Sequence, residues 1–329
     1  MALKVGVIGT GHLGRLHAKM LTEIQDGLLV GVYDESKERT AAVAAEFGVR
    51  GFSDLETILA ETDAVTIATT TNAHFAVAET AMKAGRHVFI EKPITRTVDE
   101  AGKLVDLAKA QKLVVQVGHI ERFNPAILAL EKYTVEPMFV ESHRLAQFNP
   151  RGTDVAVVLD LMIHDIDIIL SFVNSPVARI EANGVAVVSD SIDIANARIQ
   201  FENGCVANVT GSRISQRRMR KMRLFQRNEY ISLDFSEGTV EVFRLVDAAD
   251  PGATGTLMLG ELGSGKLKRK IVYEQPEVKD VNALKHELTL FIEAITGNTR
   301  PIIGAEEGKR ALEVAQVIME KIQQQKIPG

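Results

Sequence analysis

The sequence has a single cysteine, Cys205, among its 329 residues. One thiol cannot form an internal disulfide framework, and it cannot supply the paired thiolates of a metal site. The sequence therefore indicates a reducing compartment, and we predict no bound metal. An excess of positive charge is also absent, because the formal net charge is −5. This balance gives no general reason to expect nucleic acid or an anionic membrane as a partner.

The sequence also lacks a hydrophobic run that could cross a membrane. Its most apolar stretch, residues 155–173, is interrupted by three aspartates and one histidine. The opening residues, MALKVGVIGT, lead directly into a predicted strand, without the charged segment and long apolar core of a signal peptide. We therefore expect a cytoplasmic protein that is not bound to a membrane. The length suffices for two domains with their own cores.

Predicted strands and helices alternate over roughly the first 118 residues, as is typical of a doubly wound parallel sheet. After residue 120 the pattern changes to strand-like runs separated by turn signals such as Asn183-Gly184, which predict an antiparallel sheet. We predict an α/β chain with a first domain at 1–120 and a second at 121–329, with closing helices that can pack back on the first domain. Residues 125–133 are predicted to be helical and residues 246–268 to form a long loop.

A glycine-rich motif, GTGHLG, follows the first predicted strand and opens a helix. In this context the first glycine permits a tight turn, the second lets the backbone approach a pyrophosphate, and the third lets helix and strand pack closely. The helix N-terminus then offers N–H groups to phosphates. The alternative is a glycine-rich turn without a ligand. The predicted dinucleotide-binding residues are Gly9, Thr10, Gly11, His12, Leu13 and Gly14.

Asp34 lies at the end of the second predicted strand, 20 residues beyond Gly14. An acidic side chain at this place accepts hydrogen bonds from an adenosine ribose diol and repels a 2′-phosphate. We therefore predict NAD rather than NADP as the cofactor. Asp34 is also a candidate N-cap for the following helix, and the two roles are compatible.

Lys92 follows a buried strand within the sequence Glu91-Lys92-Pro93. The carboxyl ends of strands are where ligands bind in open α/β sheets, and Pro93 keeps Lys92 out of the helical conformation. A lysine there is able to stabilise alkoxide character during hydride transfer. By position alone, a solvated lysine in a turn explains the residue equally well.

A polar stripe runs along the apolar segment 154–173. Asp160, His164, Asp167 and Ser171 are spaced by four, three and four residues, so a helix places them on one face. Charges on an apolar helix are costly to bury unless they are paired or used. His164 is a candidate general base, with a core histidine as the alternative, and Asp167 is interpreted as structural.

The GTGHLG motif, the EKP sequence and the D-x-x-x-H-D helix together resemble the Gfo/Idh/MocA family of sugar and polyol dehydrogenases. The resemblance spans the chain and implies a Rossmann domain followed by a domain with an open, mostly antiparallel sheet. It places the catalytic lysine at Lys92 and the catalytic Asp and His at Asp160 and His164. Cofactor contacts are implied for Thr69, Thr70, Asn72, His74, Glu91 and Lys92. The loop TTTNAH departs from the family pattern, because Thr71 replaces a proline and the histidine comes one residue early.

The implied reaction transfers a hydride from a sugar carbon to the nicotinamide. His164 removes the hydroxyl proton, Asp160 orients the imidazole or binds a neighbouring hydroxyl, and Lys92 polarises the reacting oxygen.

Two further stretches resemble a subgroup that oxidises the 3-hydroxyl of UDP-N-acetylglucosamine. They are GHIERFNPA and RGTDVAVVLDLMIHDID. Arg122, Asn124 and Arg151 are the predicted substrate contacts, because guanidinium groups suit phosphates. Salt bridges between domains are the alternative role for both arginines.

Other readings remain open. One is an inositol or monosaccharide dehydrogenase, and another is a non-catalytic NAD- or sugar-sensing regulator with the same fold. The basic stretch 213–227 is interpreted as a solvated or oligomer-facing sheet surface rather than a nucleic-acid site. The resemblance implies a homodimer or homotetramer built through the outer face of the sheet.

Overall fold

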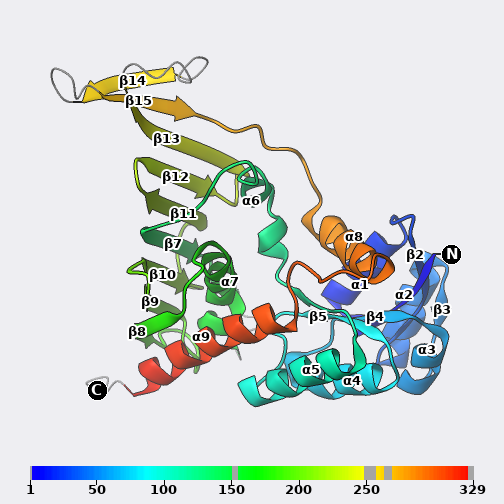
Figure 1. Cartoon of the computed structure of the whole chain (residues 1–329). Helices are drawn as coiled ribbons and strands as arrows, with labels where there is room; N and C mark the ends of the chain where they lie inside the picture. Colours follow the sequence, from blue (N-terminus) through cyan, green and yellow to red (C-terminus); the bar gives the residue numbers. More distant parts are fainter. Residues whose placement is uncertain (1, 150–154, 248–256, 263–268, 325–329) are drawn as a thin grey trace. The chain divides into compact units, whose positions relative to one another are not determined.

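The computed structural model describes residues 2–149, 155–247, 257–262 and 269–324 of the chain. The chain divides into two compact units (Figure 1). The first unit holds Met1–Phe123 and Asn282–Glu313, and the second holds Asn124–Val281 and Val314–Gly329. None of the helices in these described ranges has the length and apolarity that a membrane crossing requires.

The described part of the first unit contains a parallel sheet of six strands in the order β3-β2-β1-β4-β5-β6. The chain order reverses between β1 and β4, the position at which ligands bind in open α/β sheets. The predicted doubly wound parallel sheet is therefore confirmed. Its strands are β1 (Leu3–Ile8), β2 (Gly27–Tyr33), β3 (Arg50–Gly51), β4 (Ala64–Ile67), β5 (His87–Glu91) and β6 (Val115–Gly118).

The helices of the first unit begin and end at residues suited to those positions. Thr97 accepts a hydrogen bond from the backbone N–H of Glu100, whose side chain accepts one in return, and this capping box starts α5. Asp54 caps α3 by accepting a hydrogen bond from the backbone N–H of Thr57. Gly48 ends α2 with φ +64°, a conformation that favours glycine. The helices are α1 (His12–Leu21), α2 (Lys37–Phe47), α3 (Leu55–Glu61), α4 (Thr71–Lys83) and α5 (Val98–Gln111).

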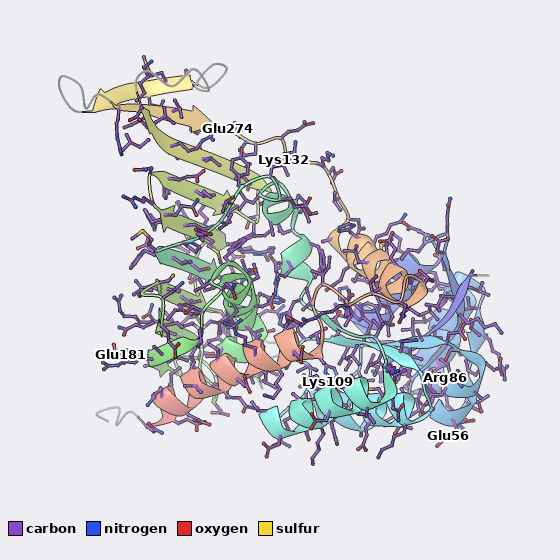
Figure 2. All side chains as sticks on the ribbon, in the orientation of Figure 1. Glu56, Arg86, Lys109, Lys132, Glu181 and Glu274 are labelled. Atoms are coloured by element: carbon purple, nitrogen blue, oxygen red, sulfur yellow. The ribbon has the colours of Figure 1, made fainter. Side chains whose placement is uncertain are left out.

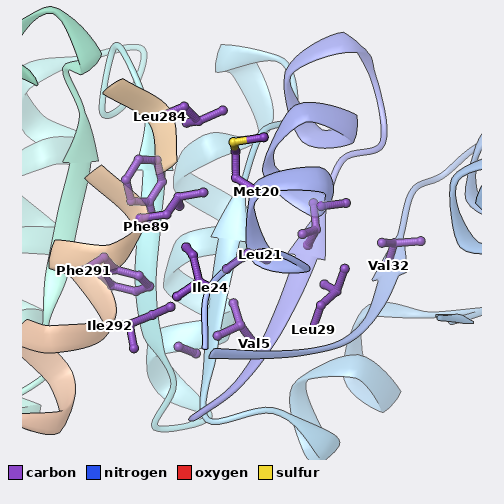
Figure 3. Close-up of a cluster of buried hydrophobic side chains, with 14 of the residues drawn as sticks. Val5, Met20, Leu21, Ile24, Leu29, Val32, Phe89, Leu284, Phe291 and Ile292 are labelled. Atoms are coloured by element: carbon purple, nitrogen blue, oxygen red, sulfur yellow. The ribbon is translucent and has the colours of Figure 1, made fainter. Parts of the chain in front are cut away.

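Helix α8 (Ala283–Thr296) completes the core of the first unit, although it follows about 160 residues later in the chain. Its side chains Phe291 and Ile292 are buried in one cluster with Phe89 of β5 and Leu21 of α1 (Figure 3). The rings of Phe89 and Phe291 meet edge to face, with centroids 5.8 Å apart. Burial of each such side chain contributes on the order of 1.5–3 kcal/mol, so α8 is part of this domain's stability.

The described part of the second unit contains a nine-stranded sheet in the order β14-β15-β13-β12-β11-β7-β10-β9-β8. All neighbours are antiparallel except β7 and β10, so the expected mostly antiparallel sheet is confirmed. The strands are β7 (Phe139–Leu145), β8 (Val177–Val185), β9 (Ile194–Phe201), β10 (Val206–Ser212), β11 (Met219–Gln226), β12 (Glu229–Asp234), β13 (Thr239–Asp247), β14 (Leu257–Leu262) and β15 (Arg269–Glu274).

Two local predictions in the second unit were wrong. Residues 246–268 were expected to form a loop, but β13 continues to Asp247 and β14 pairs with β15. The helix expected at 125–133 is shorter, since α6 covers only Pro125–Leu128. On the edge strand β8, Arg179 forms an exposed ion pair with Glu181, and Figure 2 labels Glu181.

The inner face of this sheet carries the helix that was singled out by its polar stripe. A π-helical segment, η2 (Val158–Met162), continues directly into α7 (Ile163–Phe172), which packs against β7 and β10. The long closing helix α9 (Ala305–Gln323) begins in the first unit and ends in the second.

Candidate active site

The glycine motif forms the turn between β1 and α1. Gly9 has φ +89°, and a Cβ there would lie 2.7 Å from the carbonyl oxygen of Ala68. A Cβ on Gly14 would lie 1.7 Å from the carbonyl oxygen of Gly9. Gly11 differs, because a Cβ there meets nothing within 4 Å among the described atoms. The outer glycines thus permit tight chain packing, and the middle one leaves its backbone open to a ligand.

The N-terminus of α1 lies at the open backbone of Gly11. Gly11 is the N-cap, and no side chain of the described residues caps the helix there. His12 and Leu13, the first two helical residues, are exposed. The first N–H groups of a helix attract anions, so this turn has the features that a pyrophosphate needs.

Asp34 follows β2 and faces the same turn. Its Oδ2 accepts a hydrogen bond from the backbone N–H of Thr10 at 2.7 Å, and its Oδ1 accepts from Ser36 N at 2.9 Å and Arg39 Nη2 at 2.7 Å. Burial acts to raise the pKa of Asp34, but these donors outweigh it and hold the pKa below its usual value. The carboxylate is therefore charged at neutral pH. Ser36, not Asp34, caps α2.

The loop after β4 carries the TTTNAH sequence. Thr69 is half-buried, Thr70 is the exposed N-cap of α4, and Asn72 is exposed on its first turn. His74 is buried, with Nδ1 2.9 Å from the carbonyl oxygen of Pro93 and Nε2 3.3 Å from that of Thr69. Burial lowers the pKa of His74. Its ring therefore joins the loops that follow β4 and β5.

The EKP residues end β5 at the same edge of the sheet. Glu91 turns its side chain inward, where Oε1 lies 2.9 Å from Nε2 of the fully buried His17 on α1. Its Oε2 accepts a hydrogen bond from the backbone N–H of Lys92 at 3.3 Å. Lys92 is half-exposed, and its peptide bond to Pro93 is cis. The predicted residues of β1, β2, β4 and β5 thus follow the carboxyl ends of neighbouring strands.

The second unit holds the predicted base, His164, and the predicted supporting residue Asp160. Asp160 lies in η2 and His164 is the second residue of α7, and both are half-buried. Asp167 is buried, whereas Ser171 is exposed and donates its hydroxyl to the carbonyl of Ile168. The continuous α-helical stripe expected from the sequence is therefore interrupted by a π-turn at Asp160. Such turns occur frequently at functional sites.

One buried ion pair beside His164 was not predicted. Arg144 of β7 makes a two-point contact with Asp165, the residue that directly follows His164. The alternation of β7 places Arg144 on the inner face with Val140 and Ser142. The only sequence signal for this ion pair is an arginine at an inward-facing position of an alternating strand. That signal does not identify Asp165 as the partner.

Two of the three predicted substrate contacts, Arg122 and Asn124, lie on either side of the boundary between the units in the chain. Arg122 is half-buried in η1 (Ile120–Phe123). Asn124 caps α6 by accepting from Ala126 N at 3.1 Å, and its Nδ2 donates to the carbonyl of Phe235 at 3.2 Å. Arg151 lies outside the described residues.

The residues of the first unit fit a dinucleotide. The open backbone at Gly11, the uncapped turn of α1 and the charged carboxylate of Asp34 match a pyrophosphate and a ribose diol. In the described ranges, no three His, Cys, Asp or Glu side chains gather as a metal ion requires.

Comparison with known proteins agrees with this geometry. Residues 3–119 match the model of an oxidoreductase family with an NAD-binding Rossmann fold, and residues 137–241 match the GFO/IDH/MocA C-terminal domain. The first match lies in the first unit and the second match in the second unit.

Three relatives are informative. The UDP-N-acetylglucosamine 3-dehydrogenase of Acidithiobacillus ferrooxidans is 39% identical over 95% of both chains. Its crystal structure superposes with a TM-score of 0.87 over 98% of both chains. The myo-inositol 2-dehydrogenase of Thermotoga maritima is 23% identical over 94% of this chain and 93% of its own. The scyllo-inositol dehydrogenase of Lactobacillus casei, solved with NAD(H) and scyllo-inositol, has the same fold with a TM-score of 0.77 at 21% identity, over 98% of this chain and 97% of its own.

Proposed function

Because the chain belongs to the Gfo/Idh/MocA family of NAD-binding oxidoreductases, we propose that it oxidises the 3-hydroxyl of UDP-N-acetylglucosamine, or of a closely related UDP-sugar, to a 3-keto sugar. The observation that carries the proposal is the similarity to the Acidithiobacillus enzyme along both units. The T. maritima relative supports a second candidate, the oxidation of an inositol. Its identity is much lower, so the nucleotide sugar is favoured.

NAD is the proposed cofactor, held by the glycine turn, the first turn of α1 and Asp34. Bound NAD supplies the hydride acceptor. The charged carboxylate of Asp34 accepts hydrogen bonds from a ribose diol and repels a 2′-phosphate, which favours NAD over NADP. Arg39 pairs with this carboxylate, and 59% of its own side chain is exposed.

In this mechanism His164 accepts the proton of the reacting hydroxyl, because an imidazole titrates near working pH. Lys92 donates a hydrogen bond to the reacting oxygen and stabilises its negative charge as the hydride leaves. Asp160 orients His164 or binds a neighbouring hydroxyl. Arg122 and Arg151 bind the diphosphate and Asn124 contacts the substrate.

Self-association through the outer face of the nine-stranded sheet completes the proposal. A row of aromatic rings crosses five adjacent strands on this face, with neighbouring centroids 4.9–6.0 Å apart. The inward neighbours of these rings, such as Val140 and Leu224, are fully buried. A partly exposed row of rings of this length suits an interface, so we propose a homodimer or homotetramer. The row, here called the aromatic ladder, consists of Phe139, Phe225, Tyr230, Phe243 and Tyr273.

The test follows NADH absorbance with UDP-N-acetylglucosamine or myo-inositol as the substrate. The proposal predicts turnover of the UDP-sugar, and a loss of about 10²–10⁴-fold in kcat for Lys92→Ala and His164→Ala. Turnover of inositol alone would establish the second candidate. NAD binding without turnover of either sugar, unchanged by Lys92→Ala, would indicate a regulator.

A further inference from the structure

We propose that Arg144 and Asp165 are positioning residues that fix the direction of His164 on its helix. This inference rests on the proposed role of His164 as the base. Neither residue touches the reacting atoms in the mechanism above, and both act through the backbone of α7.

The pair is buried and makes contact at two points. Arg144 Nε lies 3.0 Å from Asp165 Oδ2, and Arg144 Nη2 lies 2.8 Å from Asp165 Oδ1. The side chains are only 6% and 1% exposed. The guanidinium also lies over the ring of Phe235, with its central carbon 5.8 Å from the centroid. The planar guanidinium of Arg144 contacts both the carboxylate of Asp165 and the ring of Phe235. It therefore fixes the position of this carboxylate as well as its distance from Arg144.

Stability alone does not explain such a pair. Removing two charges from water costs several kcal/mol each, and apolar residues of similar size often replace a buried ion pair with equal or greater stability. A buried pair is therefore most informative when it fixes a geometry. Here the carboxylate belongs to the residue next to His164, so the pair fixes the backbone from which the imidazole projects.

A second buried arginine holds the other end of the same segment. Arg213 follows β10 and donates a hydrogen bond to the carbonyl oxygen of Val155. The N–H of Val157 donates to the carbonyl of Ile192 at 3.0 Å. The π-turn η2, which carries Asp160, lies between this anchor and the Arg144–Asp165 pair.

The two anchoring arginines, Arg144 and Arg213, belong to the neighbouring strands β7 and β10 or directly follow them. Arg144 on β7 stands opposite Gly211 on β10, and these are the two parallel strands of the sheet. A Cβ at Gly211 would lie 3.4 Å from that of Met162, so η2 rests closely on this pair of strands. The segment with Asp160 and His164 is thus fixed at both ends to one rigid base. Catalytic groups need such support, because a misplacement of about 1 Å is enough to cost 10²-fold in rate.

The experiment replaces both partners with apolar residues of similar size, as Arg144→Met with Asp165→Leu. We expect a melting temperature close to that of the native protein, an unchanged KM for NAD, and a kcat with UDP-N-acetylglucosamine about 10- to 100-fold lower. Amide hydrogen exchange should become faster over residues 158–172. The matched control is Arg179→Met with Glu181→Leu, an exposed ion pair on β8 that should leave kcat unchanged.

Asp165→Asn is the second variant, in case the double variant does not fold. It keeps the shape of the side chain but weakens the contact, so kcat should fall while the KM for NAD is retained. Native kcat in both variants would overturn the positioning role. A native protein that turns over no UDP-sugar would instead overturn the proposed function, and the hydrogen-exchange result would still test whether the pair orders the helix.

Discussion

At the scale of single residues, the pair of Glu91 and His17 shows how much of the EKP sequence is structural. The resemblance assigned Glu91 to the cofactor, but its carboxylate faces the buried imidazole of His17 and the backbone N–H of Lys92. Burial acts to raise the pKa of Glu91, but the hydrogen bond and charge of His17, with Lys92, keep its pKa lowered. Glu91 thus connects α1, which follows the cofactor turn, to the backbone of the proposed catalytic lysine.

His17→Leu should therefore destabilise the protein by about 1–3 kcal/mol at pH 7, because it leaves a buried carboxylate without its partner. A lowered folded pKa gives stability that is present above the unfolded pKa of about 4.3 and is lost as pH falls through the folded value. The difference between variant and native protein should consequently shrink below about pH 4. Urea unfolding at pH 7 and pH 3.5 measures it.

Arg15→Ala is the control on the same helix. Its ion pair with Glu46 is exposed and screened by solvent, so the free energy of unfolding should change far less than in His17→Leu. An equal loss in both variants, or a loss in His17→Leu that does not depend on pH, would contradict this account.

Asp34 and Arg39 give a second prediction at this scale. Asp34→Ser removes the charge that repels a 2′-phosphate and releases the guanidinium of Arg39. The ratio of kcat/KM for NADP to that for NAD should rise about tenfold or more, since one charge contact is worth about 1.4 kcal/mol or more here. Adding Arg39→Gln should abolish most of the gain. An unchanged ratio in Asp34→Ser would show that another residue selects the cofactor.

At the scale of elements, features set by residues close in sequence were easier to predict than features set by distant residues. Helix α5 begins at Val98 because Thr97 and Glu100 form a capping box. The π-turn at Asp160 was not predictable, because it arises where the helix is fixed to β7 and β10 by residues distant in sequence. Strand β14 was missed because its pattern of exposed residues, such as Leu257 and Met258, does not alternate.

The loop between β8 and β9 depends on one carboxylate. Asp193 Oδ2 accepts hydrogen bonds from the backbone N–H groups of Val187, Val188 and Ser189 at 2.7–3.0 Å. Burial acts to raise the pKa of Asp193, but these donors and the Ser189 hydroxyl hold it well below its usual range. The neighbouring carbonyl of Ile192 in turn receives the N–H of Val157. Asp193 therefore supports the start of the helix that carries His164.

Asp193→Asn should lower the free energy of unfolding at pH 7 and reduce its dependence on pH in acid. Because the folded pKa is depressed, the native stability from this group is complete above about pH 4 and is lost as pH falls toward the folded value. Chemical unfolding from pH 7 to pH 3 should show a shallower decline in the variant. Parallel curves for both proteins would contradict the role assigned to Asp193.

At the scale of the whole molecule, the sequence predicted the two architectures and the glycine turn between β1 and α1. Alternating strands and helices indicated the parallel sheet, and turn-punctuated strands indicated the antiparallel one. What it did not reveal is pairing over long distances, such as α8 with Phe89 and Arg144 with Asp165. These contacts are fixed by tertiary packing, which a local pattern does not encode.

The aromatic ladder predicts how copies of the chain associate. Phe225→Glu places a charge in the middle of the row, where its neighbours are Phe139 and Tyr230. Sedimentation velocity should show a shift toward smaller species, with the fold retained by circular dichroism. Lys83→Glu, on the exposed surface of α4, is the control and should leave the assembly unchanged. An assembly of native size in Phe225→Glu would place the interface elsewhere.

The central claim is that a hydride leaves C3 of a UDP-sugar for the nicotinamide. The most direct test supplies UDP-N-acetylglucosamine carrying deuterium at C3, with NAD, and measures the reduced cofactor by mass spectrometry. The account predicts that the deuterium appears in the cofactor and that turnover is slower than with the unlabelled sugar. Reduced cofactor without deuterium, or no reduction with this sugar, would contradict it.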